Sequence, residues 1–189
     1  MKLNEAHKFI FNKIILLSIL AVVIIGFFLG FRITTNPSLE FYRLIRISDV
    51  YLNIPNQTGN TLLFFAVRLL IHAQAFAIIW FLAHIPRLLI LIYGLLFVYV
   101  FNYAVVFTVL YSQSGFKHAV ALILPGALIL LTVYTFTAYA CIRHAVKEIK
   151  SKTFRQSPDL TYLLLGFLFS AAAAIIETWV TPLIIDRII

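Results

Sequence analysis

The chain has little of what catalytic, metal-binding or disulfide-linked proteins are built from. Only 12% of its 189 residues are charged, and its single cysteine excludes an internal disulfide. It has no HExxH, no GxSxG and no phosphate-binding glycine loop, and its aspartates all lie outside the apolar runs. The five histidines are scattered along the chain rather than spaced as zinc ligands. We therefore expect no enzyme activity, no metal and no cofactor.

Apolar residues make up 62% of the chain and gather into runs long enough to cross a bilayer. The first run follows Lys2, Lys8 and Lys13 as in a signal peptide, but it is too long and no small-residue cleavage pattern follows it. The sequence predicts an all-α integral membrane protein, a single membrane domain over residues 1–189. About five transmembrane helices are expected, at residues 14–31, 62–82, 88–111, 119–142 and 162–185.

Basic residues predict the orientation of these spans. The segment 143–159 is the most basic in the chain, so we expect it to be a cytoplasmic loop. With alternating spans, nine Lys and Arg residues fall on the cytoplasmic side and five on the other. This places the protein in the cell membrane with a cytoplasmic amino terminus and a carboxyl terminus outside. The net charge of +8 is then explained by orientation and contact with anionic lipid, and no nucleic-acid partner is expected.

The outer segment 32–60 predicts an amphipathic helix at the membrane interface. Asn36 is suited to an N-cap and Pro37 to the first helical position, while Pro55 ends the helix, which we expect from Pro37 to Asn53. This helix would be either a docking surface for a partner or a lid over the ends of the spans.

Glycines and a proline mark further features of the spans. Gly26 and Gly30 form a GxxxG motif, which serves packing within the protein or dimerisation. Residues 112–117 predict a short turn, and Pro125-Gly126 predicts a kink or local break in the fourth span.

Polar or irregular features of four spans, including Pro125-Gly126 in the fourth, fall in one layer of the outer half of the membrane. Arg68 and His72 lie one helical turn apart in the second span, Asn102 lies in the third, and Glu177 lies in the fifth. Glu177 shares a face of small residues, which are Gly166, Ser170, Ala173, Ala174 and Thr181.

A carboxylate inside a membrane usually faces protein or a water-filled cavity. We expect Arg68 to pair with Glu177, since an arginine can bind a carboxylate with two hydrogen bonds, and we expect the pair to join the second span to the fifth. In the alternative, Arg68 extends to the outer interface and Glu177 is protonated or hydrated. A proton or ion pathway would need a relay across the membrane, for which the deeper positions offer only His72 and hydroxyl groups.

This order of features resembles the stage II sporulation protein M family of bacterial and archaeal membrane proteins. The final AAAAIIETWVTPLI, with Glu177, Thr181 and Pro182, is the most specific similarity, and Leu124-Pro125-Gly126 is similar to the family's Leu-Pro-His-Gly. The histidine of that motif is missing, and apolar residues replace the acid that follows it. The resemblance therefore extends to Pro125, Gly126, Glu177 and Pro182 as family positions.

The resemblance implies a non-enzymatic subunit of a larger membrane complex. Its relatives include accessory proteins of circular-bacteriocin maturation, export or immunity, and scaffolds for cell-wall hydrolases during sporulation engulfment. The divergent motif and the small outer segment favour the bacteriocin role. The partners expected are the bilayer and other integral membrane proteins, such as an ABC transporter or a second copy. A small oligomeric transporter or channel that uses Glu177 is the alternative from a different class.

Overall fold

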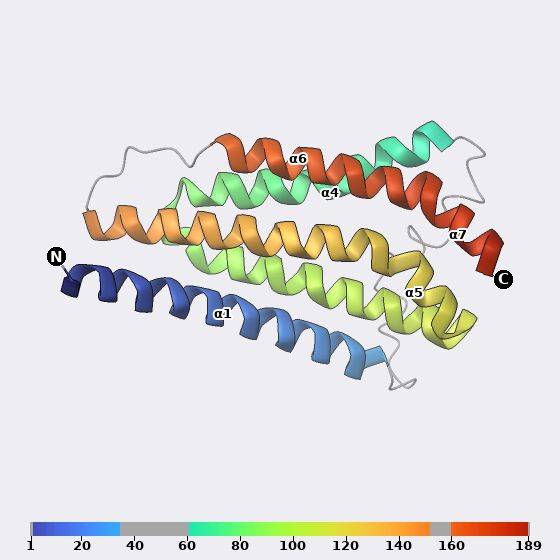
Figure 1. The fold of residues 1–189 in the computed structure, drawn as a ribbon, viewed down its shortest axis with the longest axis horizontal. Helices are drawn as coiled ribbons and strands as arrows, with labels where there is room; N and C mark the ends of the chain where they lie inside the picture. Colours follow the sequence, from blue (N-terminus) through green and yellow to red (C-terminus); the bar gives the residue numbers. More distant parts are fainter. Residues whose placement is uncertain (1, 35–60, 152–159, 189) are drawn as a thin grey trace.

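The structure is a computed structural model that describes residues 2–34, 61–151 and 160–188, and only residues 84–85 of these lie outside a helix. The helices are α1 (Lys2–Thr34), α4 (Thr61–Ala83), the short η1 (Pro86–Leu88), α5 (Leu89–Ser151), α6 (Leu160–Ile175), η2 (Ile176–Val180) and α7 (Thr181–Ile188). Figure 1 shows them as one elongated bundle with the two chain ends at opposite ends. The predicted all-helical fold is therefore confirmed.

Within the described residues, five helical stretches are long and apolar enough to cross a membrane, as the sequence predicts. They are Asn12–Ile33, Thr61–Ala83, Leu89–Ser112, Gly115–Lys147 and Leu160–Ile184. The protein is therefore a multi-pass membrane protein. The predicted interfacial helix and residues 152–159 of the predicted basic loop lie outside the described residues, whereas residues 143–151 of that loop continue α5 as helix.

The third and fourth spans are the two arms of α5, which folds back on itself at Gly115. This glycine has φ 84° and ψ 170°, a left-handed conformation that side chains with a Cβ rarely adopt. The turn lies within the predicted residues 112–117. Of the kink or local break expected at Pro125-Gly126, the local break is wrong, because Gly115 alone departs from helical dihedral angles within α5, and the kink stays a prediction. A helix can continue through a proline that lacks its N–H when neighbouring helices hold it in place.

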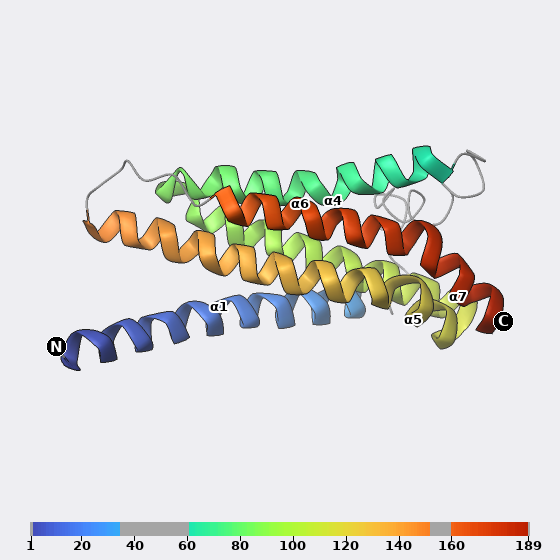
Figure 2. The same ribbon diagram turned by 45° about the horizontal axis from the view of Figure 1, so that its top comes forward.

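Helix α1 packs against α5, and α5 is its only partner among the described elements (Figure 2). The contact is close because it is made at glycines. A Cβ added to Gly26 would lie 3.2 Å from the main-chain oxygen of Phe97, and one added to Gly30 would lie 2.7 Å from that of Phe101. The GxxxG motif therefore serves packing within the protein.

The remaining core lies between α4, α5 and α6. The ring of Phe76 on α4 stacks on the ring of Tyr134 on α5, with centroids 4.3 Å apart and planes 17° apart. On its other side Phe76 meets α6 at Gly166, where an added Cβ would lie 2.6 Å from the ring. Three helices are thus held in fixed register by one buried aromatic side chain, which sets the positions of the polar residues farther along the bundle.

Candidate functional site: a buried acid shared by three helices

Arg68 and His72 lie on the inner face of α4, one turn apart. Their exposed fractions are 4% and 1%, so both polar groups are removed from the surface of the bundle. The Arg68 guanidinium carbon lies 5.0 Å from the centroid of the Phe64 ring, close enough for a cation–π contact. The alternative in which Arg68 extends to the membrane interface is therefore not what the structure contains.

Glu177 meets both side chains through one carboxylate oxygen. Its Oε2 lies 3.0 Å from Nε2 of His72 and 3.6 Å from Nη1 of Arg68. When the carboxylate is ionised it only accepts hydrogen bonds, and Nε2–H of the imidazole is then the donor in the shorter contact. Arg68 contributes a compensating charge at a distance too long for a strong hydrogen bond.

The expected pairing of Arg68 with Glu177 is present as an ion pair of 3.6 Å between Nη1 and Oε2, although the closer contact with that oxygen is made by His72. His72 is bound to Oε2. The other oxygen, Oε1, lies against Gly126 of α5, where an added Cβ would come within 2.5 Å of it. The carboxylate is thus held between a hydrogen-bond donor from α4 and bare backbone from α5.

The close contact with the Glu177 carboxylate explains why the fourth span has a glycine at position 126. Any side chain there would displace the carboxylate, which is buried with an exposed fraction of 9%. Pro125 precedes it on α5 and is half-buried. The dipeptide therefore supplies a close approach between α5 and the last span rather than a break in the helix.

Glu177 lies in a short π-helix, η2, where the hydrogen bonds are one residue longer than in an α-helix. The backbone N–H of Thr181 donates to the oxygen of Ile176 across this segment. Pro182 follows directly, and a proline both lacks an N–H and clashes with the carbonyl four residues earlier, which favours such a rearrangement. Thr181 is 2% exposed, on the same inner side as Glu177.

The predicted small-residue face of the last span does point inward. Gly166, Ser170, Ala173, Ala174, Thr178 and Thr181 are buried, and the large apolar residues Phe167, Leu168, Phe169, Ile175, Trp179 and Val180 between them are exposed. Asn102 is a predicted site residue that does not join Arg68, His72 and Glu177. It is half-buried on the first arm of α5, and no hydrogen bond or ion pair joins it to the cluster in the described part of the chain.

Sequence reasoning did not identify Tyr134 as a site residue, although it contacts α4 at His72. Its hydroxyl donates a hydrogen bond of 3.1 Å to the main-chain oxygen of His72, and its ring is fully buried against Phe76. The position of this tyrosine deep in an apolar span could have indicated such a contact, because a buried hydroxyl normally has a hydrogen-bond partner.

Among the described residues, no group of three or more His, Cys, Asp or Glu side chains could hold a metal ion. From here on, Arg68, His72, Gly126 and Glu177 are called the Glu177 cluster.

Comparison with known proteins gives one match. A family model described as stage II sporulation protein M matches residues 15–182, which include every member of the Glu177 cluster. No curated protein and no solved structure matches the chain.

Proposed function

Because the chain belongs to the stage II sporulation protein M family, we propose that it works as a non-enzymatic subunit of a larger membrane complex. In this role the bundle is a rigid body on which other integral membrane proteins assemble. The partners would be membrane proteins such as an ABC transporter or a second copy of the chain.

One observation carries the proposal, namely that the carboxylate of Glu177 contacts residues of two other helices and so joins them to the last span. Glu177 is bound by His72 at 3.0 Å, compensated by Arg68 at 3.6 Å and packed against Gly126. Removing one partner from a buried ion pair is strongly destabilising, so such a group suits a fixed joint better than a moving one. The polar residues inside the bundle are therefore used for contacts between its own helices. Its outer apolar surface and its ends are the surfaces that can contact other proteins.

Within this role we favour accessory work in bacteriocin maturation, export or immunity over a scaffold for cell-wall hydrolases. The support is the departure from the family's Leu-Pro-His-Gly motif at Leu124-Pro125-Gly126 and the short outer segment 32–60. The genes beside this one distinguish the two. A peptide precursor and an ATPase favour the bacteriocin role, and sporulation hydrolase genes favour engulfment.

The direct test is co-expression of the tagged chain with the membrane proteins encoded beside it, followed by purification in mild detergent. We expect one of them to co-purify in a fixed ratio with the wild type and with Leu168→Ala, a change at a residue 64% exposed on α6. For the bacteriocin role, the chain with its partner should raise the bacteriocin concentration needed to stop growth of a sensitive host. Recovery of the chain alone in every pairing would contradict the proposal.

The transporter alternative is tested with the same protein in liposomes. It requires Glu177→Gln to abolish ion or peptide flux while the protein stays folded and assembled. The subunit role requires instead that this change lower the stability of the protein, the recovery of its partner, or both. It also requires that the wild type show no flux.

A further inference from the structure

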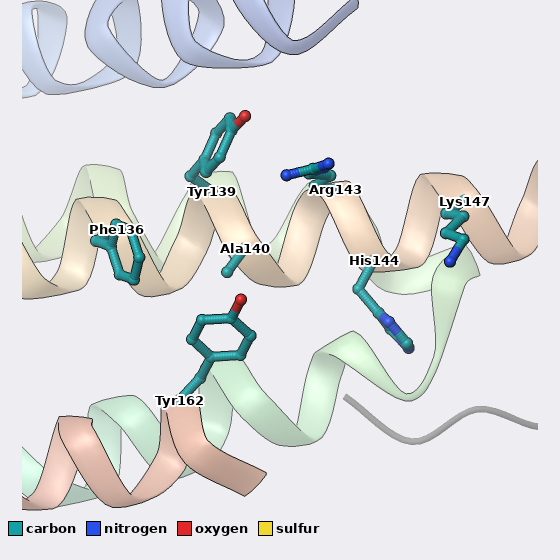
Figure 3. A pocket seen from close by; sticks show the side chains of 7 residues that line it. All are labelled: Phe136, Tyr139, Ala140, Arg143, His144, Lys147 and Tyr162. Atoms are coloured by element: carbon teal, nitrogen blue, oxygen red, sulfur yellow. The ribbon is translucent and has the colours of Figure 1, made fainter. Parts of the chain in front are cut away.

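A hollow of about 370 Å³ lies between α5 and the start of α6, at the end of the bundle far from the Glu177 cluster (Figure 3). Seven residues line it, namely Phe136, Tyr139, Ala140, Arg143, His144, Lys147 and Tyr162. Six of them come from α5 at intervals of three or four residues, so they lie along one side of that helix. Tyr162 forms the wall on α6, and its hydroxyl points toward α5 in Figure 3.

The lining combines positive charge with aromatic surface and contains no acid. Arg143 and Lys147 are exposed, one turn apart, and neither forms an ion pair within the described residues. Behind them the hollow is apolar, since Ala140 is buried and the rings of Phe136 and Tyr162 lie 6.1 Å apart.

The hollow lies where two of the candidate membrane spans have their ends. Lys147 is the last residue of the fourth span, and Tyr162 lies near the start of the fifth, which begins at Leu160. At this level a ligand would meet headgroups on one side and acyl chains on the other. Arginine binds phosphate through a planar fork and lysine as a point charge, while tyrosine is suited to the interface itself.

We propose that this hollow binds the phosphate of an anionic phospholipid, with the headgroup at Arg143 and Lys147 and the glycerol end of the acyl chains against Phe136 and Tyr162. Basic pockets between transmembrane helices bind such headgroups. The shared chemistry is a phosphate group, which a free phosphate compound also carries, so the test includes both sources.

The experiment is native mass spectrometry of the full chain in detergent, titrated with phosphatidylglycerol or with phosphatidylcholine of the same acyl chains. We compare the wild type with the double variant Arg143→Gln, Lys147→Gln. The matched control is Arg87→Gln, which removes an exposed charge in η1, outside the hollow and at the same end of the bundle. The thermal midpoint of lipid-free protein checks that each variant is folded.

We expect the wild type to bind phosphatidylglycerol more tightly than phosphatidylcholine. The double variant should bind phosphatidylglycerol roughly thirty-fold more weakly, from about 1 kcal/mol for each basic residue near the headgroups. Arg87→Gln should keep the wild-type affinity.

Three results would overturn the proposal. Equal affinity for the two lipids would show that the protein does not distinguish the charge of the headgroup. A loss of affinity in Arg87→Gln as large as that in the double variant would show a general electrostatic effect. Inorganic phosphate or glycerol phosphate that binds the wild type and displaces the lipid at equal concentration would identify a soluble phosphate compound as the ligand.

Discussion

Glu177→Gln removes the negative charge of the cluster and keeps the size of the side chain. The glutamine oxygen can still accept the hydrogen bond from His72, and the amide still fits against Gly126. What is lost is the charge that compensates Arg68, which is 4% exposed. The substitution therefore tests charge compensation with little change in packing.

The magnitude follows from the geometry. Two unit charges at the observed 3.6 Å attract each other by about 4–5 kcal/mol at an effective dielectric constant of about 20. Breaking a buried ion pair by removing one partner costs about 3–5 kcal/mol in measured cases. We therefore expect Glu177→Gln to lower the free energy of unfolding by about 3–5 kcal/mol.

Reversible unfolding in mixed micelles, followed by tryptophan fluorescence, is a suitable assay. The ring of Trp179 lies 5.2 Å from the ring of Phe65, so its emission reports on the contact between η2 and α4. The control is Arg87→Met, a change at an exposed arginine, which should alter the free energy of unfolding by less than about 0.5 kcal/mol.

A double-mutant cycle with Arg68→Met decides the cause. Methionine removes the cation and keeps an unbranched apolar chain, so the double variant has no uncompensated buried charge. We expect it to be more stable than the sum of the single changes by roughly 2–3 kcal/mol. A coupling energy below about 0.5 kcal/mol would refute the reasoning. Exchanging the two residues is a poorer test, because an arginine at position 177 would be too long for the space beside Gly126.

Glycine contacts give two further predictions with the same assay. Gly126→Ala places a Cβ 2.5 Å from the carboxylate of Glu177 and should cost about 2 kcal/mol or more, and this cost should disappear in a Glu177→Ala background, since the obstacle is then gone. Gly30→Ala places a Cβ 2.7 Å from the main-chain oxygen of Phe101 and should cost about 1–3 kcal/mol, whereas Gly94→Ala, with nothing within 4 Å, should be neutral or stabilising. Equal effects at Gly30 and Gly94 would show that the α1–α5 contact is not close in the membrane.

The spans were predictable because length and hydropathy alone decide whether a helix can cross a bilayer. The predicted first span, 14–31, lies inside the observed Asn12–Ile33, and the other four agree to within a few residues at most ends. The largest difference is the fourth span, which extends to Lys147 because a helix does not stop where its apolar residues stop. Apolar runs therefore locate the membrane, and helix ends depend on capping and contacts.

The Glu177 cluster was only partly predictable. Depth arithmetic brings Arg68 and Glu177 to the same layer, since every residue adds a fixed rise along a helix. It does not determine which α4 side chain makes the hydrogen bond. That choice depends on the rotation and offset of α4 against the last span, which are fixed by the contact of Phe76 with Gly166. Such contacts between distant residues leave no periodic signal in the sequence.

The π-helix was not predicted, although Pro182 gives a local reason for it. The same proline could bend the helix, end it or add one residue to a turn, and these outcomes differ by little in local energy. In the folded protein the longer turn lies at Glu177 itself, and the carboxylate meets both α4 and α5. Packing against neighbouring helices selects among the local alternatives.

The same contacts bear on whether Glu177 could serve as a moving site. A transport cycle needs two arrangements of similar free energy, each populated during turnover. Releasing the carboxylate would break the Arg68–Glu177 ion pair at a cost of about 3–5 kcal/mol, which limits a released arrangement to below about 1% of molecules. Movement of Glu177 would also separate η2 from Gly126, where the fit depends on the missing side chain. A carboxylate fixed in this way holds α4, α5 and the last span at one depth, as a subunit with an unchanging shape requires.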